Sequence, residues 1–237
     1  MLNILIAERM KLKRNKLLLM CTLFAVVLPT FALPPYEGEA VNVIDWVFRL
    51  QMFFQLAIYP VLSGFIVTFL LQKEYADQTV INTLTAPVGR MKYLLGKLCV
   101  WLMWYLTVTV CFFGIICLRV NVYFGAEALS THLPDIAVNI FRTGMLYYAT
   151  MTPVAWIAVL QKKIFYPSLL ATLAITAIGA AAWLARGVMG SVIPWLAVVM
   201  LLIPNSGVIA GAAYASIALC CAGGLALAAY AFKRQEL

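Results

Sequence analysis

Few side chains in this sequence could carry out catalysis, and those few are not spaced to act together. Nucleophilic hydrolysis needs a serine or cysteine beside a histidine base, but His132 is the only histidine in the 237 residues. A zinc site needs cysteines or histidines a few residues apart, yet no CxxC or HxxxH pairing occurs. The six cysteines all lie in apolar runs, which is typical of small packing residues. We therefore expect no metal site and no hydrolytic centre.

The closest approach to a phosphate-binding loop is the segment GRMKYLLGKL, residues 89–98. A P-loop reads GxxxxGK followed by Ser or Thr, whose hydroxyl meets magnesium. Here six residues separate Gly89 from Gly96, and Leu98 follows Lys97. We therefore predict no nucleotide site in this chain, and we do not expect the chain itself to be an enzyme.

The composition is that of a membrane protein. Apolar residues make up 65% of the chain and charged residues only 11%, and the mean hydropathy is +0.97. Soluble domains are about 45–50% apolar and about 25% charged, so this chain cannot cover a water-exposed surface with polar groups. A soluble enzyme, a DNA-binding domain and a disordered chain are excluded. The net charge of +8 then points to an anionic membrane surface, and no nucleic-acid partner is expected.

Apolar runs long enough for tilted membrane helices follow one another along the chain. A helix needs about 20 apolar residues to cross the hydrocarbon core. The runs cover residues 17–33, 48–71, 94–118, 136–160, 164–185 and 207–232. They predict an all-α, polytopic membrane protein with six transmembrane helices, folded as a single domain over residues 1–237. A further apolar segment, 193–203, is too short to span and contains Pro194, so it predicts a re-entrant or interfacial helix before the last span.

The first 16 residues carry a mixed pattern of basic and apolar side chains. On a helix Leu2, Leu5, Ile6 and Met10 share one face, while basic residues occupy the rest. This pattern favours an interfacial helix over residues 1–16 that lies along the membrane. A plain basic flank of the first span is the alternative, and both give the same topology.

The basic residues orient the predicted bundle. Thirteen of the 17 fall on one side: five in residues 1–16, four in 73–97, two at 162–163 and two at 233–234. Because basic residues accumulate on the cytoplasmic side of a membrane, both termini are predicted to be cytoplasmic and the chain to be a multi-pass protein of the lipid bilayer.

The longest predicted inner segment, residues 73–97, carries the most information. It begins with a charged cluster that includes Glu74, continues into a short amphipathic helix over residues 79–84, and breaks at Pro87. Arg90 then leads into a helix that continues as the third span. Proline removes a backbone donor and disfavours helix at the residue before it. The pattern predicts a helix–turn–helix on the inner surface, where a soluble motor could push on the bundle.

This segment resembles that of ABC-2-type permeases, whose equivalent loop has an acidic residue, a small-polar turn before an amphipathic helix, an "aPvsR" stretch and then "llgKl". The corresponding residues here are Glu74, Gln78-Thr79, 86–90 (APVGR) and 94–98 (LLGKL). Gln78 and Gly89 depart from the usual glycine and serine. The size of the chain and its opening, MLNILIAERMKLKR, resemble the small permeases of lantibiotic-immunity and bacitracin-resistance exporters.

The resemblance implies the partners and cofactors. The helix over 79–84 would be a coupling helix that docks on separate ABC ATPase subunits, which would hold the ATP and magnesium. A second permease copy or a paralogue would complete a central path in the bacterial plasma membrane. The residues that this implies for ATPase coupling are Glu74, Thr79, Val80, Ile81, Leu84, Pro87 and Arg90.

Candidate residues for contact with a substrate lie at the predicted outer face. Glu37, Glu39 and Asp45 form an acidic group in the first outer loop, suited to attract a cationic peptide. Arg49 and Arg142 lie just inside apolar runs. An intramembrane charge is a functional candidate, but a long arginine stem also allows the charge to reach the lipid headgroups. Both interpretations of the two arginines stay open.

These features favour the membrane subunit of a bacterial ABC exporter that expels an amphipathic or membrane-active substrate, such as an antimicrobial peptide. The cargo would leave from the outer leaflet or the central path. A non-transporting membrane partner, acting as a sensor or assembly factor through its inner loop, is the alternative from another class. An intramembrane enzyme ranks third, and the absence of acids within the spans disfavours a proton-relay transporter.

Overall fold

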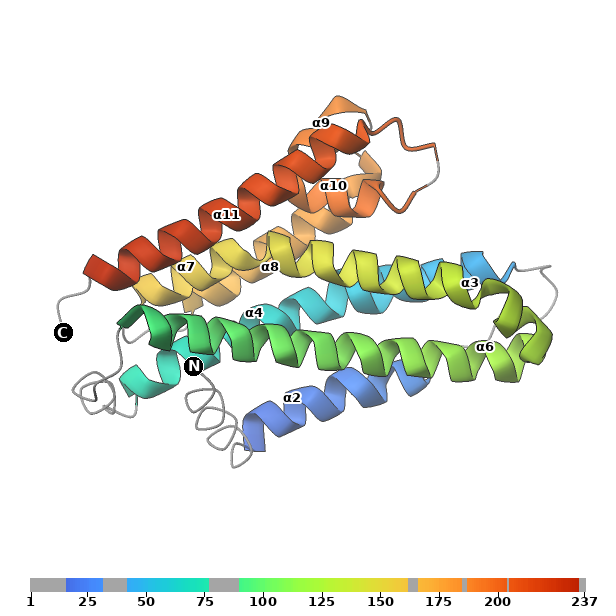
Figure 1. The fold of residues 1–237 in the computed structure, drawn as a ribbon, viewed down its shortest axis with the longest axis horizontal. Coiled ribbons are helices and arrows are strands. Elements are labelled where there is room, and N and C mark those ends of the chain that lie inside the picture. The colour runs from blue at the N-terminus through green and yellow to red at the C-terminus, as the bar shows by residue number, and fades with distance from the viewer. Residues whose placement is uncertain are drawn as a thin grey trace.

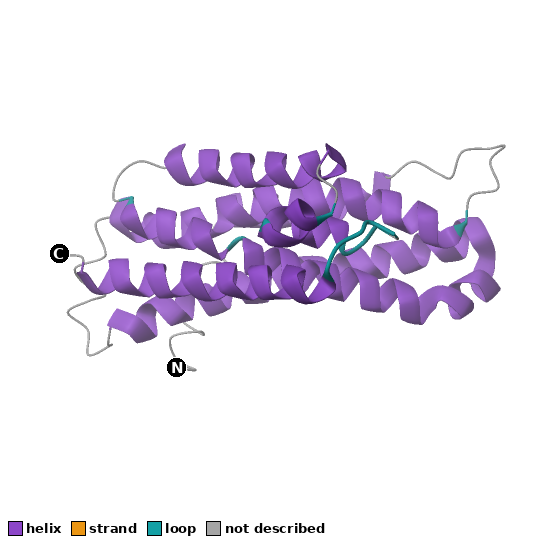
Figure 2. Ribbon diagram, turned by 90° about the horizontal axis from the view of Figure 1, so that it is seen from above, coloured by secondary structure: helices purple, strands orange, loops and turns teal. Residues whose placement is uncertain are grey.

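The apolar segments fold into helices that run side by side along one long axis in the computed structural model (Figures 1 and 2). The structure describes residues 16–31, 42–76, 90–161, 166–184, 187–203 and 205–234. Within these ranges no strand occurs. The expectation of an all-helical protein is therefore confirmed.

The helices follow the predicted apolar runs, with boundaries of their own. They are α2 (Lys16–Val27), η1 (Leu28–Phe31), α3 (Val43–Leu50), η2 (Gln51–Ile58), α4 (Tyr59–Ala76), α6 (Arg90–Thr150), α7 (Thr152–Leu160), α8 (Tyr166–Ala180), η3 (Ala181–Leu184), α9 (Val188–Val192), α10 (Pro194–Met200) and α11 (Ala210–Arg234). Of these, η1 and η3 are 3₁₀ turns, and η2 is a π-helix that joins α3 to α4 without a break.

Three helical runs of the described chain are long and apolar enough to cross a membrane: Val43–Lys73, Met91–Leu160 and Ala210–Arg234. Two shorter apolar runs, Lys16–Phe31 and Tyr166–Ala180, correspond to the predicted first and fifth spans. The predicted third and fourth spans, residues 94–118 and 136–160, both lie in the run Met91–Leu160, which the non-helical Gly125 divides in two. The structure thus gives three long apolar helices and some shorter ones where the sequence predicts six separate spans.

The longest run folds back on itself at Gly125. This residue has φ 87° and ψ 167°, a conformation that side chains with a Cβ rarely adopt, and it separates two limbs of α6. The limbs, residues 90–124 and 126–150, run antiparallel (green and yellow-green in Figure 1). At 1.5 Å per residue the first limb is about 50 Å long, which exceeds a hydrocarbon core of about 30 Å. The first limb is therefore longer than a single crossing needs, and Glu127, just after the turn, is exposed.

The α4 helix forms the centre of the bundle, packed against α6, α7 and α8. Its Ile66 and Val67 are fully buried, as are Trp101 and Phe112 on the first limb of α6. The indole of Trp101 donates to Ser63 Oγ at 2.9 Å, which gives the one polar atom of this large side chain a partner inside the core.

Two shorter segments were also predicted from the sequence, residues 193–203 and residues 1–16, and the structure describes only the first of them in full. For residues 193–203 the structure has the short helix α10, whose residues from Leu196 to Met200 are all buried, followed by a turn at Leu201. The predicted interfacial helix, residues 1–16, lies outside the described residues except for Lys16.

Candidate functional site

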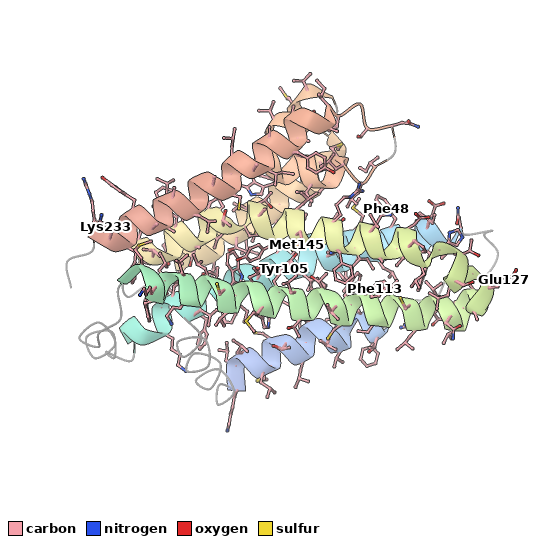
Figure 3. All side chains as sticks on the ribbon, viewed as in Figure 1. Phe48, Tyr105, Phe113, Glu127, Met145 and Lys233 are labelled. Carbon is pink, nitrogen blue, oxygen red and sulfur yellow. The ribbon has the colours of Figure 1, made fainter. Side chains whose placement is uncertain are left out.

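Charged side chains gather at the two ends of the bundle, with lysines at one end and a mixture of acidic residues and arginines at the other. Lys73 at the end of α4, Lys97 near the start of α6 and Lys233 at the end of α11 lie at one end, called here the basic end. At the opposite end, called the acidic end, α3 begins near Asp45 and the α6 hairpin carries Glu127. Figure 3 labels Lys233 and Glu127 at these two ends.

The described residues that flank the predicted ATPase-coupling segment lie at the basic end. The last turn of α4 contains Glu74, and α6 begins at Arg90, so the connection between them starts and finishes at this end. Five predicted residues lie outside the described part of the chain: Thr79, Val80, Ile81, Leu84 and Pro87.

Lys97 joins the start of α6 to α4 beneath this connection. Its side chain is only 3% exposed, and Nζ donates to the carbonyl oxygen of Leu70 at 2.7 Å. The ammonium also lies 5.0 Å from the centre of the Tyr93 ring, within the range of a cation–π contact. A buried charge needs such partners, because burial alone would strongly disfavour it.

A second polar connection at this end links three helices. Gln72 of α4 donates to Gln161 Oε1 at 2.7 Å, and Ser168 of α8 donates to the same oxygen at 3.1 Å. Thr68 donates to Ser168 Oγ at 3.0 Å. Gln161 follows the last residue of α7, so this network joins α4, α7 and α8 close to the predicted cytoplasmic loops.

At the acidic end a cavity of about 240 Å³ lies between α3, the second limb of α6 and the turn after α10. Two carboxylates and two amides line it: Asp45, Asp135, Gln51 and Asn139. The other lining residues are apolar: Ile44, Val47, Phe48, Ile136 and Leu202. Asp45 was predicted to face a substrate from the sequence, and here it lies in a cavity wall. Glu37 and Glu39 lie outside the described residues.

A wider hollow of about 640 Å³ adjoins this cavity along α3 and η2 and shares Asp45 and Phe48 with it. Its lining continues through Arg49, Met52, Phe53 and Ala57. Phe53 is 59% exposed, so the hollow opens toward the side of the bundle. Arg49 was also predicted to lie near a substrate. It lines this hollow and does not line the smaller cavity.

Arg142 is half-buried on the second limb of α6. One guanidinium nitrogen donates to Asn139 Oδ1 at 3.2 Å, one turn nearer the hairpin, while Nε is buried with no hydrogen-bond partner in the described chain. The side chain therefore reaches toward the acidic end, next to the cavity that Asn139 lines, without being part of its wall.

Sequence reasoning missed several of these residues. Gln51 and Gln55 are buried near the start of the predicted span 48–71, and Gln55 donates to the carbonyl oxygen of Ile140 at 2.7 Å. Two amides four residues apart in an apolar run were an available signal, because a buried amide needs a partner on another helix. Asp135 gave no such signal, since its position opposite α3 depends on the α6 hairpin.

The described residues contain no group of three His, Cys, Asp or Glu side chains that could hold a metal ion. All six cysteines are free. The described residues offer buried polar contacts at the basic end and a partly acidic, partly apolar cavity at the other.

A comparison with protein families matches residues 4–181 to the family described as ABC-2 family transporter protein. No curated protein and no solved structure matches the chain. The family match covers most of the 237 residues and includes the predicted coupling segment and the α6 hairpin. This helical membrane chain therefore belongs to the ABC-2 family of transporter proteins.

Proposed function

We propose that this chain is the membrane subunit of a bacterial ABC exporter and works with a separate ATPase that binds ATP and magnesium. The observation that carries the proposal is the family match across the segment between α4 and α6, together with the place of the two helix ends that flank this segment, both at the basic end. A soluble ATPase on the cytoplasmic side would meet this end first, since basic residues favour the cytoplasmic side.

The proposed topology has six membrane crossings with both termini in the cytoplasm. The crossings are α2 with η1, α3 through α4, the first limb of α6, the second limb with α7, α8 with η3, and α11. The short crossings are supported by their 3₁₀ extensions, since Lys16–Phe31 rises about 24 Å and bilayers thin to match short spans at modest cost. A second copy or a paralogue would complete the translocation path.

In the proposed mechanism the predicted helix over residues 79–84 docks in a groove on the ATPase. Closure of the ATPase pair moves this helix, and the movement passes to α4 and α6, which the segment joins. Two contacts support efficient transmission into the bundle: Lys97 to the Leu70 carbonyl, and Gln72 to Gln161, which leads to α7 and α8. Hydrogen-bonded, buried contacts of this kind transmit displacement better than a flexible surface would.

The proposed cargo is amphipathic or membrane-active, most simply an antimicrobial peptide that the exporter removes in self-protection or resistance. The acidic end supports this, because the hollow beside Met52 and Phe53 opens to the side of the bundle, where a lipid-associated molecule would arrive. The cargo would leave toward the outside without crossing the whole bilayer.

The test of the coupling proposal is Leu84→Asp. Apolar anchors dominate many protein interfaces, and truncating one typically costs about 2 kcal/mol or more, while a buried charge costs further. We expect the variant to insert normally and to lose pull-down of the ATPase, or the cargo-stimulated part of its turnover, by at least tenfold. The measurement is ATPase pull-down and turnover in lipid vesicles.

The matched control is Asn82→Asp, which adds the same charge at a polar position of the same predicted helix. It should retain pull-down and turnover within about twofold. Wild-type pull-down and turnover in Leu84→Asp would contradict the coupling role and favour a sensor or assembly protein instead.

A further inference from the structure

We propose that the 240 Å³ cavity at the acidic end binds the positively charged group of a cationic amphiphile, an ammonium or guanidinium on an apolar stem. The inference deepens the proposed function, since it names the chemical class of the cargo. It can be tested on this chain alone.

The charged residues in the cavity wall favour the binding of a cation. Asp45 and Asp135 face the cavity from two different helices, α3 and the second limb of α6. Neither carboxylate has a hydrogen-bond or ion-pair partner within the described ranges of the chain, and the wall contains no basic residue. Arg49 lines only the outer hollow, and Arg142 is directed to Asn139. The wall of this cavity, as far as the structure describes it, therefore presents two exposed carboxylates and no basic side chain of its own.

A neutral acceptor completes the cavity. Gln51 is 3% exposed, and its amide nitrogen donates to Gln55 Oε1 at 3.3 Å. Its own carbonyl oxygen has no donor among the residues that the structure describes. This oxygen is not among the fully buried atoms without a partner in the described chain, so it is accessible from the cavity that Gln51 lines and is free to accept a hydrogen bond there. The N–H groups of a bound ammonium or guanidinium would supply that donor.

The apolar stem of the ligand has a place beside the cavity. Phe48 forms part of both the cavity and the outer hollow, and Met52, Phe53 and Ala57 extend the apolar surface along η2. A ligand could therefore place its charge between the two carboxylates and its stem along this hollow. An anionic amphiphile would meet two carboxylates and is rejected.

The experiment titrates the purified full-length chain in phosphatidylcholine nanodiscs with octylammonium, using calorimetry and an empty-nanodisc blank. Octanol and octanoate serve as neutral and anionic probes of the same length. We expect octylammonium to bind at least tenfold more tightly than octanol, and octanoate to show no binding. Equal binding of octylammonium and octanol would overturn the proposal.

Variants connect the charge preference to the cavity. Asp45→Asn and Asp135→Asn should each weaken octylammonium binding at least tenfold. Glu127→Gln, which removes a carboxylate from the same end of the molecule but not from the cavity wall, should stay within twofold of wild type. Equal losses in all three variants would show a general surface-charge effect and would overturn the proposal.

Ile44→Lys gives a second test that keeps both carboxylates in place. Ile44 lines the cavity and is 37% exposed, so a longer polar side chain fits without disrupting the core. The added ammonium should compete for the carboxylates and abolish octylammonium binding, whereas Ile44→Gln should retain it. Unchanged binding in Ile44→Lys would overturn the assignment.

Two sources could supply this chemistry: a basic peptide side chain or an ethanolamine headgroup. Nanodiscs that contain phosphatidylethanolamine distinguish them, because a headgroup ligand would compete and lower the apparent octylammonium affinity. Competition supports the cation pocket with lipid as its occupant, and unchanged affinity supports it with a basic side chain. No ATPase is present in these measurements, so failure here leaves the result for Leu84→Asp unaffected.

Discussion

Individual polar side chains inside this bundle have partners on neighbouring helices, and those partners connect one helix to the next. The side-chain oxygen of Gln161 is the acceptor for both Gln72 and Ser168. Lys97 likewise joins α6 to a backbone carbonyl of α4. In an apolar environment a polar group without a partner is costly, so each of these residues favours a single arrangement of the helices.

Gln161→Met tests the network at the residue scale. The methionine keeps the length of the side chain but removes the oxygen that accepts from Gln72 and Ser168. We expect the free energy of unfolding, measured by SDS titration in mixed micelles, to fall by about 1–3 kcal/mol, because buried donors lose their acceptor.

Thr107→Val is the matched control for this measurement. Thr107 is exposed, and its hydroxyl donates only to the carbonyl oxygen of Met103 one turn away. Removing it leaves no donor buried without an acceptor, so the change should stay within about 0.5 kcal/mol. If Gln161→Met and Thr107→Val change the free energy of unfolding by the same amount, the network contributes nothing to stability.

At the scale of whole helices, small residues decide how closely the elements approach. α11 packs mainly on α7. A Cβ built on Gly224 would lie 2.7 Å from the backbone carbon of Thr152 and the nitrogen of Pro153. On the adjacent Gly223 it would have nothing within 4 Å. Backbone atoms of α7 cannot move aside as a side chain can, and close approach through small residues is how membrane helices pack well.

Gly224→Ala should therefore separate α11 from α7. Overpacking of a tight contact typically costs about 1–3 kcal/mol, and we expect a loss of that size in the SDS-unfolding free energy. Gly223→Ala should leave stability unchanged or slightly increased, because alanine favours helix over glycine. A larger loss in Gly223→Ala than in Gly224→Ala would show that α11 presents a different side to α7.

At the scale of the whole molecule, the lysines of the described chain lie at one end of the long axis, whereas Asp45 and Glu127 lie with Arg49 and Arg119 at the other. Figure 3 labels Lys233 at the first of these ends and Glu127 at the second. Basic residues on short loops set the orientation of a bundle, while acidic residues contribute little. The lysine-bearing end is therefore expected to face the cytoplasm.

Single cysteines in a background without the six native ones test this orientation. A membrane-impermeant maleimide should label Glu127→Cys in intact cells and should label Lys233→Cys only after permeabilisation. Both positions are exposed, so a lack of labelling reports the membrane barrier and not burial in the protein. The reverse pattern would invert the proposed topology.

Much of the fold follows from the spacing of apolar and charged residues alone. The runs around α4, α6 and α11 are apolar over distances that only a membrane helix needs, and Arg90 begins α6 where the predicted coupling segment finishes. The family was also recognisable from residues 73–97, and the comparison with families confirms the ABC-2 resemblance. Each of these features lies within one segment of the chain, so the order of the residues alone is enough to predict it.

Other features arise only when distant segments meet. The predicted third and fourth spans lie antiparallel because a single residue, Gly125, takes φ 87° and turns the chain between them. That fold places Asp135 opposite Asp45, 90 positions earlier, and creates the cavity between them. Gln161 likewise meets Gln72 only after α7 and α4 pack.

The sequence by itself thus determined that this is a membrane protein, that it is helical and which family it belongs to. Hydropathy and short motifs each act within one segment, so they can be recognised without the fold. Tertiary structure decided the acidic cavity, the polar network at the basic end and the contact at Gly224. Each depends on distances between side chains on different helices, and those distances follow from packing, which no periodicity within a single helix specifies.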